Sequence, residues 1–307
     1  MKKIGNSSIW YEKYSPLCAE DIILPDDLHK TLIKFITSKD IPNLGLFSSE
    51  PGTGKSSLAN VILKELKCDA KWINASLENG IDVLRNDIHR FAATGSSNDE
   101  TKIVVMDEAD YLNANSTQPA FRGFLDDYSK NCRFIFTGNY KEKIIEPLLN
   151  RLQVFDFNSF KKEEMVKPIF ERLKFILDNE KIQYDPKDLI PVINTCYPSI
   201  RNMIGTLQRC SATGIFTPAN LDDSNIYENT MKLVSPNTYL EMIAAVNNLN
   251  APENMFSYIY KNASKFFTPA NYPKVIVTVA KYQHMSSSVR DKGLNLAACL
   301  TELVGLR

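Results

Sequence analysis

Short apolar runs alternate with helical patterns over the first half of the chain. Residues 44–47 form an apolar run, and after a polar loop the apolar side chains of residues 57–67 recur at helical spacing. Three more segments, 71–74, 102–106 and 133–137, look like strands and are separated by segments long enough to cross between parallel strands. This order predicts an α/β fold built on a parallel sheet.

The second half of the chain has a different pattern. From about residue 160 strand-like runs become scarce, and Met165, Ile169, Leu173 and Leu177 are spaced for one face of a helix. A polar stretch at 221–225 interrupts the helices, and apolar patterning resumes from residue 238 to the C-terminus. We therefore expect a smaller helical domain and then a third, also helical, unit.

The composition supports folded domains and excludes several classes. The 307 residues include 36 basic and 36 acidic side chains and are 44% hydrophobic, so disordered and collagen-like chains are excluded. The formal net charge of zero excludes a wholly basic protein, but a local basic stripe can still bind nucleic acid. More than one domain is expected at this length.

Cysteine spacing and hydropathy indicate in which cellular compartment the protein works and whether it binds zinc. The six cysteines are scattered without a C-x-x-C pair, which favours reduced thiols that bind no zinc. The first residues are too polar for a signal peptide, and no apolar run approaches the roughly 18 residues of a membrane span. We expect a cytoplasmic protein with no membrane partner.

A glycine-rich loop stands between the first apolar run and the helix after it. Phosphate binding requires close backbone N–H donors, a lysine charge and a hydroxyl for Mg²⁺. The loop and the helix start supply these groups in Gly52, Thr53, Gly54, Lys55, Ser56 and Ser57. Ser49 stands where the motif G-x-x-x-x-G-K-[ST] has its first glycine. The sequence therefore predicts a phosphate-binding loop for ATP, and the alternative is a chance glycine turn.

Polar residues end two later strands. Asp107 and Glu108 follow the run at 102–106, where Asp107 could hold Mg²⁺ together with Ser56 and Glu108 could polarise an attacking water. Asn139 follows the run at 133–137 and could bind that water or the terminal phosphate, although an asparagine there is also typical of a turn. Together with the loop lysine, these residues form a predicted catalytic set.

These motifs resemble those of the AAA-type ATPases, and more narrowly of clamp-loader subunits. Residues 12–16, Glu-Lys-Tyr-Ser-Pro, resemble the family's adenine-pocket motif E-K-Y-R-P, with Ser15 in place of its arginine. The resemblance assigns adenine binding to Tyr11, Glu12, Lys13, Tyr14 and Ile23. Tyr14 and Ile23 could instead be core residues.

The resemblance also assigns two arginines. Arg201, in Pro-Ser-Ile-Arg-Asn, matches the family's second sensor. Arg151 matches the arginine of its Ser-Arg-Cys element, which completes a neighbouring subunit's site, although Asn150 and Leu152 depart from that element. The alternative for Arg151 is a surface ion pair.

Within this family the chain looks most like the large subunit of T4-type bacteriophage sliding-clamp loaders. Segments 11–14, 21–25, 51–55 and 197–201 carry that likeness, and cellular clamp-loader small subunits remain an alternative. The resemblance implies an ATPase domain at 1–158, a helical lid at 159–225 and a helical collar at 226–307. It also implies assembly of several copies, a homotetramer, with a small companion subunit.

The implied activity is DNA-stimulated ATP hydrolysis with Mg²⁺, which loads a sliding clamp onto primer–template DNA. Arg85, Arg90 and Arg122 are candidates for the DNA backbone, unless they pair with acids such as Asp82, Asp87 and Asp126. Two other functions stay open, a branch-migration or helicase motor and a nucleotide sensor without turnover.

Overall fold

The computed structural model describes residues 5–78, 80–94, 102–217, 224–249, 252–286 and 288–306. The chain divides into two compact units, residues 1–218 and 219–307. Of the polar stretch expected at 221–225, residues 221–223 lie outside the described residues. The domain limits drawn from the sequence stay predictions.

The first unit is built on a five-stranded parallel sheet with strand order β2-β3-β4-β1-β5. Its strands are β1 Leu44–Phe47, β2 Ala70–Asn74, β3 Lys102–Asp107, β4 Cys132–Gly138 and β5 Gln153–Asp156. The predicted α/β fold with a parallel sheet is confirmed. The sequence interpretation missed β5, a four-residue edge strand in which only Phe155 is buried, instead of an apolar run.

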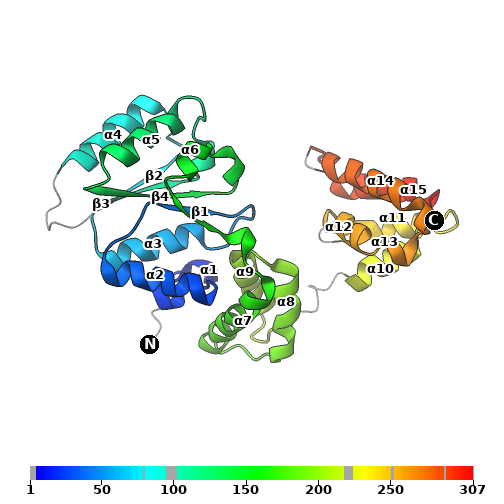
Figure 1. Cartoon of the computed structure of the whole chain (residues 1–307). Helices are drawn as coiled ribbons and strands as arrows, with labels where there is room; N and C mark the ends of the chain where they lie inside the picture. Colours follow the sequence, from blue (N-terminus) through cyan, green and yellow to red (C-terminus); the bar gives the residue numbers. More distant parts are fainter. Residues whose placement is uncertain are drawn as a thin grey trace. The chain divides into compact units, whose positions relative to one another are not determined.

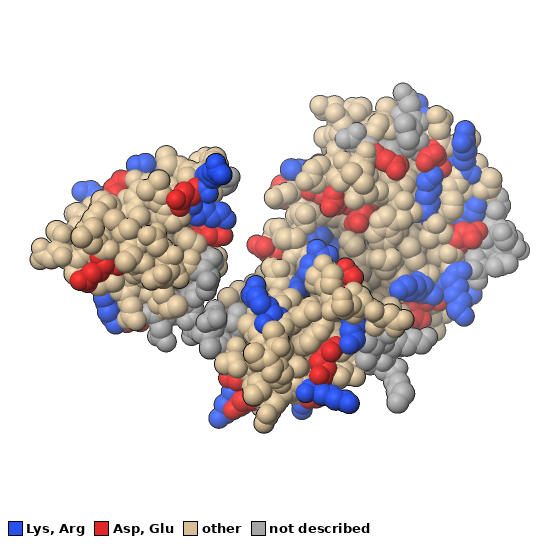
Figure 2. All heavy atoms as spheres, turned by 180° about the vertical axis from the view of Figure 1, so that it is seen from behind, with Lys and Arg blue, Asp and Glu red and all other residues tan. Residues whose placement is uncertain are grey.

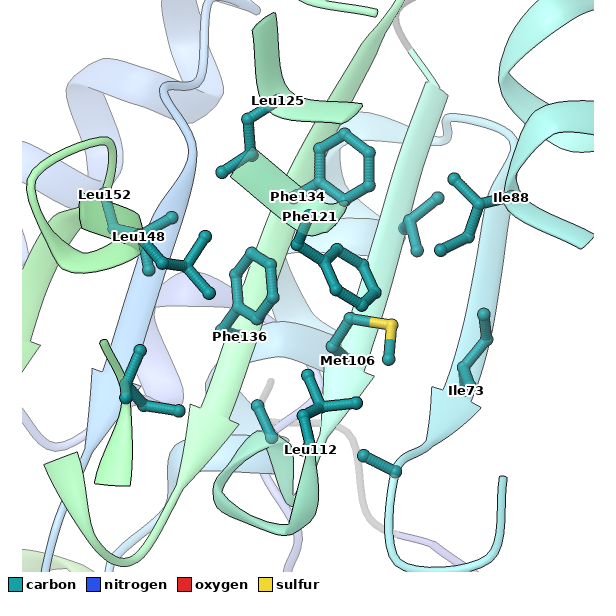
Figure 3. Close-up of a cluster of buried hydrophobic side chains, with 14 of the residues drawn as sticks. Ile73, Ile88, Met106, Leu112, Phe121, Leu125, Phe134, Phe136, Leu148 and Leu152 are labelled. Atoms are coloured by element: carbon teal, nitrogen blue, oxygen red, sulfur yellow. The ribbon is translucent and has the colours of Figure 1, made fainter. Parts of the chain in front are cut away.

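Helices cover both faces of this sheet (Figure 1). On one face lie α4 Ile81–Ala93, α5 Thr117–Asp127 and α6 Glu146–Leu149, and on the other α2 Asp26–Ser38 and α3 Lys55–Leu66. Phe121 of α5 packs between Phe134 and Phe136 of β4 and extends the core toward Ile88 of α4 (Figure 3). Burial of these aromatic rings holds α5 on the sheet, and burial of Ile88 in the same cluster holds α4 there.

Short elements connect the sheet with its surroundings. The N-terminal helix α1 Trp10–Lys13 comes before α2, and 3₁₀ turns occupy Ala19–Asp21, Ala109–Tyr111, Lys141–Lys143, Phe157–Ser159 and Pro186–Asp188. Three longer helices then complete the first unit: α7 Lys162–Asn179, α8 Leu189–Cys196 and α9 Ile200–Cys210. We call α7 to α9 the lid. The face of α7 expected from its spacing is buried, with Leu173 and Leu177 fully covered.

The second unit is helical in its described part. Its helices are α10 Ser224–Lys232, α11 Tyr239–Asn247, α12 Asn254–Lys261, α13 Ala263–Phe266, α14 Tyr272–Met285 and α15 Lys292–Val304, with a 3₁₀ turn at Pro269–Asn271. They enclose a separate core that includes Phe256, Val275 and Leu300. Among all the described residues, no helix is long and apolar enough to cross a bilayer.

Candidate nucleotide-binding site

The carboxyl ends of the strands meet at one edge of the sheet, and a cavity of about 460 Å³ opens there. β1 lies between β4 and β5, so the loop after it and the ends of β3 and β4 share this edge. Ligands of open parallel sheets bind at such an edge. The cavity lining includes Pro51 to Ser57, Asp107, Glu108, Thr137 to Asn139, and Arg201.

The glycine loop has the backbone that a phosphate cradle requires. Gly52 and Gly54 have φ angles of 77° and 107°, in the region that favours glycine. A Cβ on Gly54 would meet nothing within 4 Å, so the loop is open beside it, and α3 begins at the next residue. A helix N-terminus behind an open glycine loop is an anion site, and the residues present therefore fit a phosphate chain.

Lys55 is buried and bonded to the loop itself. Its Nζ donates to the carbonyl oxygens of Ser48 and Glu50 at 3.3 and 3.2 Å and to Asn139 Oδ1 at 2.9 Å. Burial lowers the pKa of Lys55 to about 8, although nearby carboxylates oppose the shift. A bound phosphate would supply the negative charge that this cation requires.

Ser56 and Asp107 meet as the magnesium prediction expects. Ser56 Oγ donates to Asp107 Oδ1 at 3.0 Å, and the Thr137 hydroxyl donates to the same oxygen. A hydroxyl and a carboxylate side by side are oxygen ligands of the kind that Mg²⁺ prefers. The pair fits this ion, and Thr137 orients the carboxylate.

Glu108 and Asn139 lie at the ends of adjacent strands on the same cavity wall. Glu108 has a left-handed backbone, with φ 56°, and its N–H donates to Thr137 Oγ1 at 3.3 Å. The Asn139 N–H donates to Asp110 Oδ1 at 3.2 Å. Buried Asp110 thus fixes the backbone that presents Asn139 to Lys55.

The lid contacts the glycine loop directly. The Arg201 N–H donates to the Gly52 carbonyl oxygen at 3.1 Å. A Cβ on Gly52 would lie 2.7 Å from Ser199 Oγ and 2.8 Å from Arg201 Cβ. The Arg201 guanidinium lies 5.9 Å from the centre of the Tyr11 ring. Glycine at position 52 therefore suits both the loop conformation and the close contact with the lid.

The N-terminal residues also line the cavity, with one exception. Tyr11, Glu12, Tyr14 and Ile23 belong to the lining, but Lys13 does not. Lys13 Nζ is 2.5 Å from Glu180 Oε1 at the end of α7. Tyr14 is almost wholly buried, and burial together with its bond to Glu180 raises the pKa of its hydroxyl. Base binding by these residues stays a prediction.

Arg151 lies outside the cavity lining. Its Nε and Nη2 donate to the two oxygens of Asp126, each at 3.0 Å, and its Nη1 donates to the Pro147 carbonyl oxygen at 2.9 Å. Within a single chain Arg151 therefore forms a surface ion pair, which is the alternative considered for it. Its action on a neighbouring chain stays a prediction.

The three candidate DNA-binding arginines are exposed on α4 and α5. Of the acids proposed as partners, Asp87 is bonded to Lys71 at 2.7 Å and Asp126 to Arg151, while the side chain of Asp82 lies outside the described residues. Basic and acidic side chains are interspersed on the face shown in Figure 2. The described residues of this face form no uniformly basic surface (Figure 2), so DNA binding would depend on individual side chains such as these three arginines.

Several residues at the cavity were not found by sequence reasoning. Arg172 and Asp21 line it as a buried ion pair at 3.4 Å, and the Arg172 Nη2 also donates to the Tyr14 carbonyl oxygen at 2.7 Å. The available signal was an arginine beside the apolar positions of a helix, where a charge is buried only with a partner. No pattern pointed to Glu180.

The comparisons with known proteins agree with this geometry. The family described as "ATPase family associated with various cellular activities (AAA)" matches residues 45–160. The replication factor C small subunit of Sulfurisphaera tokodaii is 39% identical over 215 residues, 68% of this chain and 64% of that protein, so the match spans just under two thirds of the relative's length. The one from Thermofilum pendens is 33% identical over 265 residues, 83% of this chain and 78% of that protein.

A solved structure shows the same fold. The structure described as the Thermotoga maritima RuvB Holliday junction branch migration motor has a TM-score of 0.55 and 12% identity, covering 72% of this chain and 78% of that one. At this identity the likeness concerns the fold alone.

Fold and site thus define a P-loop nucleotide-binding protein of the AAA class. The chain belongs to the AAA ATPase family, in the branch that contains the replication factor C small subunits.

Proposed function

We propose that this chain is an ATPase subunit of a sliding-clamp loader. The loader opens a ring-shaped clamp and places it on primer–template DNA, and DNA-stimulated ATP hydrolysis closes and releases the clamp. One observation carries the proposal: a single cavity joins the phosphate loop, Asp107 and Glu108, Asn139 and the lid residue Arg201, in a chain homologous to replication factor C small subunits. Such a subunit would work in the cytoplasm, which for a bacteriophage protein is that of the host.

At the phosphate end, each residue has a distinct task. The N–H groups of the loop and the start of α3, residues 52–57, would cradle the phosphates. Lys55 would exchange its carbonyl partners for the β- and γ-phosphates, and Ser56 with Asp107 would hold Mg²⁺, which neutralises phosphate charge when bound.

The hydrolytic step would use the neighbouring strand ends. Glu108 would orient and polarise the attacking water, and Asn139 would bind the water or the γ-phosphate. Arg201 would sense the phosphates from the lid, while Tyr11, Glu12, Tyr14 and Ile23 would enclose the base. Lys13 belongs to the same motif but contacts the lid.

We further propose that Arg151 acts in trans on a neighbouring copy of this chain. An arginine that reaches into an adjacent nucleotide site can stabilise the transition state and raise the rate of hydrolysis by a factor of roughly 10³–10⁵. The pair with Asp126 is exposed to solvent, and it would have to open before Arg151 could reach another chain. Mixed complexes of Arg151→Ala and Lys55→Ala subunits should recover activity only where an intact Arg151 faces an intact Lys55.

The motif likeness supports a finer assignment, to the large ATP-binding subunit of a T4-type bacteriophage loader. Four copies of such a subunit would assemble with one small companion protein. Sizing the chain mixed with a candidate companion, with and without a non-hydrolysable ATP analogue, tests this assembly.

DNA would be held along its backbone by Arg85, Arg90 and Arg122 on α4 and α5. Backbone contacts make affinity fall with salt and leave it nearly independent of sequence. Neutral glutamine substitutions should lower DNA-stimulated ATPase and its salt dependence. If both stay at parent values, these arginines have only a surface role.

An ATPase assay with and without primer–template DNA and clamp tests the function as a whole. A clamp loader should respond to primer–template DNA and further to the clamp. Stimulation by branched DNA without any clamp effect would indicate a branch-migration motor, and ATP binding without turnover would indicate a nucleotide sensor.

A further inference from the structure

The N-terminal segment, residues 8–14, is bonded to the lid. Gln208 of α9 accepts from the Trp10 N–H at 3.0 Å and donates to the Ser8 carbonyl oxygen at 2.9 Å. One side chain thus satisfies a donor and an acceptor at the start of α1. In Figure 1, α1 lies beside α9.

A second connection comes from the end of α7. Glu180 Oε1 accepts from Lys13 Nζ at 2.5 Å and from the Tyr14 hydroxyl at 2.6 Å. The Lys13 and Glu180 side chains are 28% and 17% exposed, so water screens this contact less than it would a fully exposed pair. A carboxylate that accepts two donors on one oxygen holds both donor side chains in place.

A third connection is the buried arginine of α7. Arg172 donates to the Tyr14 carbonyl oxygen, and its pair with Asp21 reaches the turn that follows the segment. Arg172 of α7, Glu180 directly after α7 and Gln208 of α9 therefore hold residues 8–14.

These contacts matter because both partners line the nucleotide cavity. Tyr11, Glu12 and Tyr14 form one part of its wall, and Arg201 on the lid another. The Tyr11 ring already lies against the Arg201 guanidinium. A change in the segment's position would therefore move part of the cavity wall.

We propose that Glu180 is a positioning residue for nucleotide binding: it fastens residues 10–14 to the lid, so that the N-terminal wall and Arg201 close on the nucleotide as one piece. In this arrangement Lys13 contributes by holding Glu180 and not by touching the base. The proposal rests on the proposed function only in requiring that this cavity binds ATP.

The test compares Glu180→Leu with a change at an exposed glutamate of α7, Glu171→Leu; α7 ends directly before Glu180. In the full chain, Glu180→Leu should raise the Kd for a fluorescent ATP analogue on the order of fivefold to tenfold. At saturating ATP, kcat should stay within about twofold of the parent value, because the catalytic strand ends are untouched. Glu171→Leu should match the parent.

Two further measurements separate positioning from a general loss of stability. Glu180→Gln retains an acceptor oxygen and should recover part of the affinity. In hydrogen exchange with bound analogue, the amides of residues 10–14 should lose protection in Glu180→Leu, while those of residues 52–57 keep it.

The outcomes are distinct. An unchanged Kd in Glu180→Leu, or equal loss of protection at residues 10–14 and 52–57, would overturn this inference. Lys55→Ala serves as the reference in the same assay. If the parent chain bound no analogue, the proposed function itself would fall.

Discussion

The part of the cavity proposed to bind phosphates, the phosphate end, is lined mainly by consecutive residues, 51–57, and by the ends of two adjacent strands. The part proposed to bind the base is lined by residues 11–12, 14–16 and 21–23, Arg172 and the start of α9. The first set follows β1, β3 and β4 of the sheet or stands at their ends. The second is joined by side-chain bonds across the sequence, such as that between Arg172 and Tyr14, 158 positions apart. The first part of the cavity wall therefore depends on the sheet, and the second depends on contacts between the N-terminal segment and the lid.

Changing Glu108 should impair ATP hydrolysis but not ATP binding. Glu108→Gln should lower turnover by about 10²–10⁴, because the amide can no longer polarise the attacking water. ATP affinity should remain near the parent value, since the N–H cradle is intact. Single-turnover hydrolysis and nucleotide titration measure the two effects; hydrolysis at the parent rate would move the catalytic role to Asp107 or Asp110.

Removing the charge of Lys55 should weaken ATP binding. Lys55→Ala should weaken ATP binding by about 100-fold or more, since a buried cation reaching two phosphates is lost. Lys64→Ala, an exposed lysine on the same helix, is the matched control. Titration calorimetry measures both, and a parent-like affinity in Lys55→Ala would argue against a phosphate cradle.

Gly52 lies in the glycine loop and also contacts the lid, so changing it tests how far the lid affects the phosphate end. Gly52→Ala should reduce ATP affinity by roughly tenfold, because a Cβ at φ 77° is strained and would press on Ser199 and Arg201. Gly123→Ala is the control, since a Cβ there meets nothing within 4 Å. Equal affinities in the two variants would show that the lid does not press on the loop in the bound state.

The smallest expected effect is a pH dependence confined to the phosphate end. The Lys55 pKa is lowered to about 8 by burial, and bound phosphates would favour its charged form. The complex then holds more protons than the free chain, so affinity is full below pH 8 and falls as the pH rises above it. Between pH 7.5 and 8.5 the Kd should rise about threefold. Lys55→Arg should flatten this profile, and a flat parent profile would contradict the lowered pKa.

Sequence reasoning succeeded wherever the signal was local. The strands at 44–47 and 102–106 and the glycine loop are contiguous patterns, and the structure contains β1, β3 and the loop where they were expected. It failed at β5, whose four residues lack an apolar run. Base binding by Lys13 stays a prediction, although Lys13 is not among the residues that line the cavity. A motif carries no information about which of its side chains faces a cavity.

By itself, the sequence determined the parallel α/β class, the phosphate loop and the acidic strand end, since these depend on residue type and spacing over a few positions. Only the tertiary structure decided the strand order, the Arg172–Asp21 pair and the bonds of Glu180 to Lys13 and Tyr14. The physical reason is that such contacts join segments far apart in the chain. Their partners are selected by packing of the whole unit, which no short pattern records.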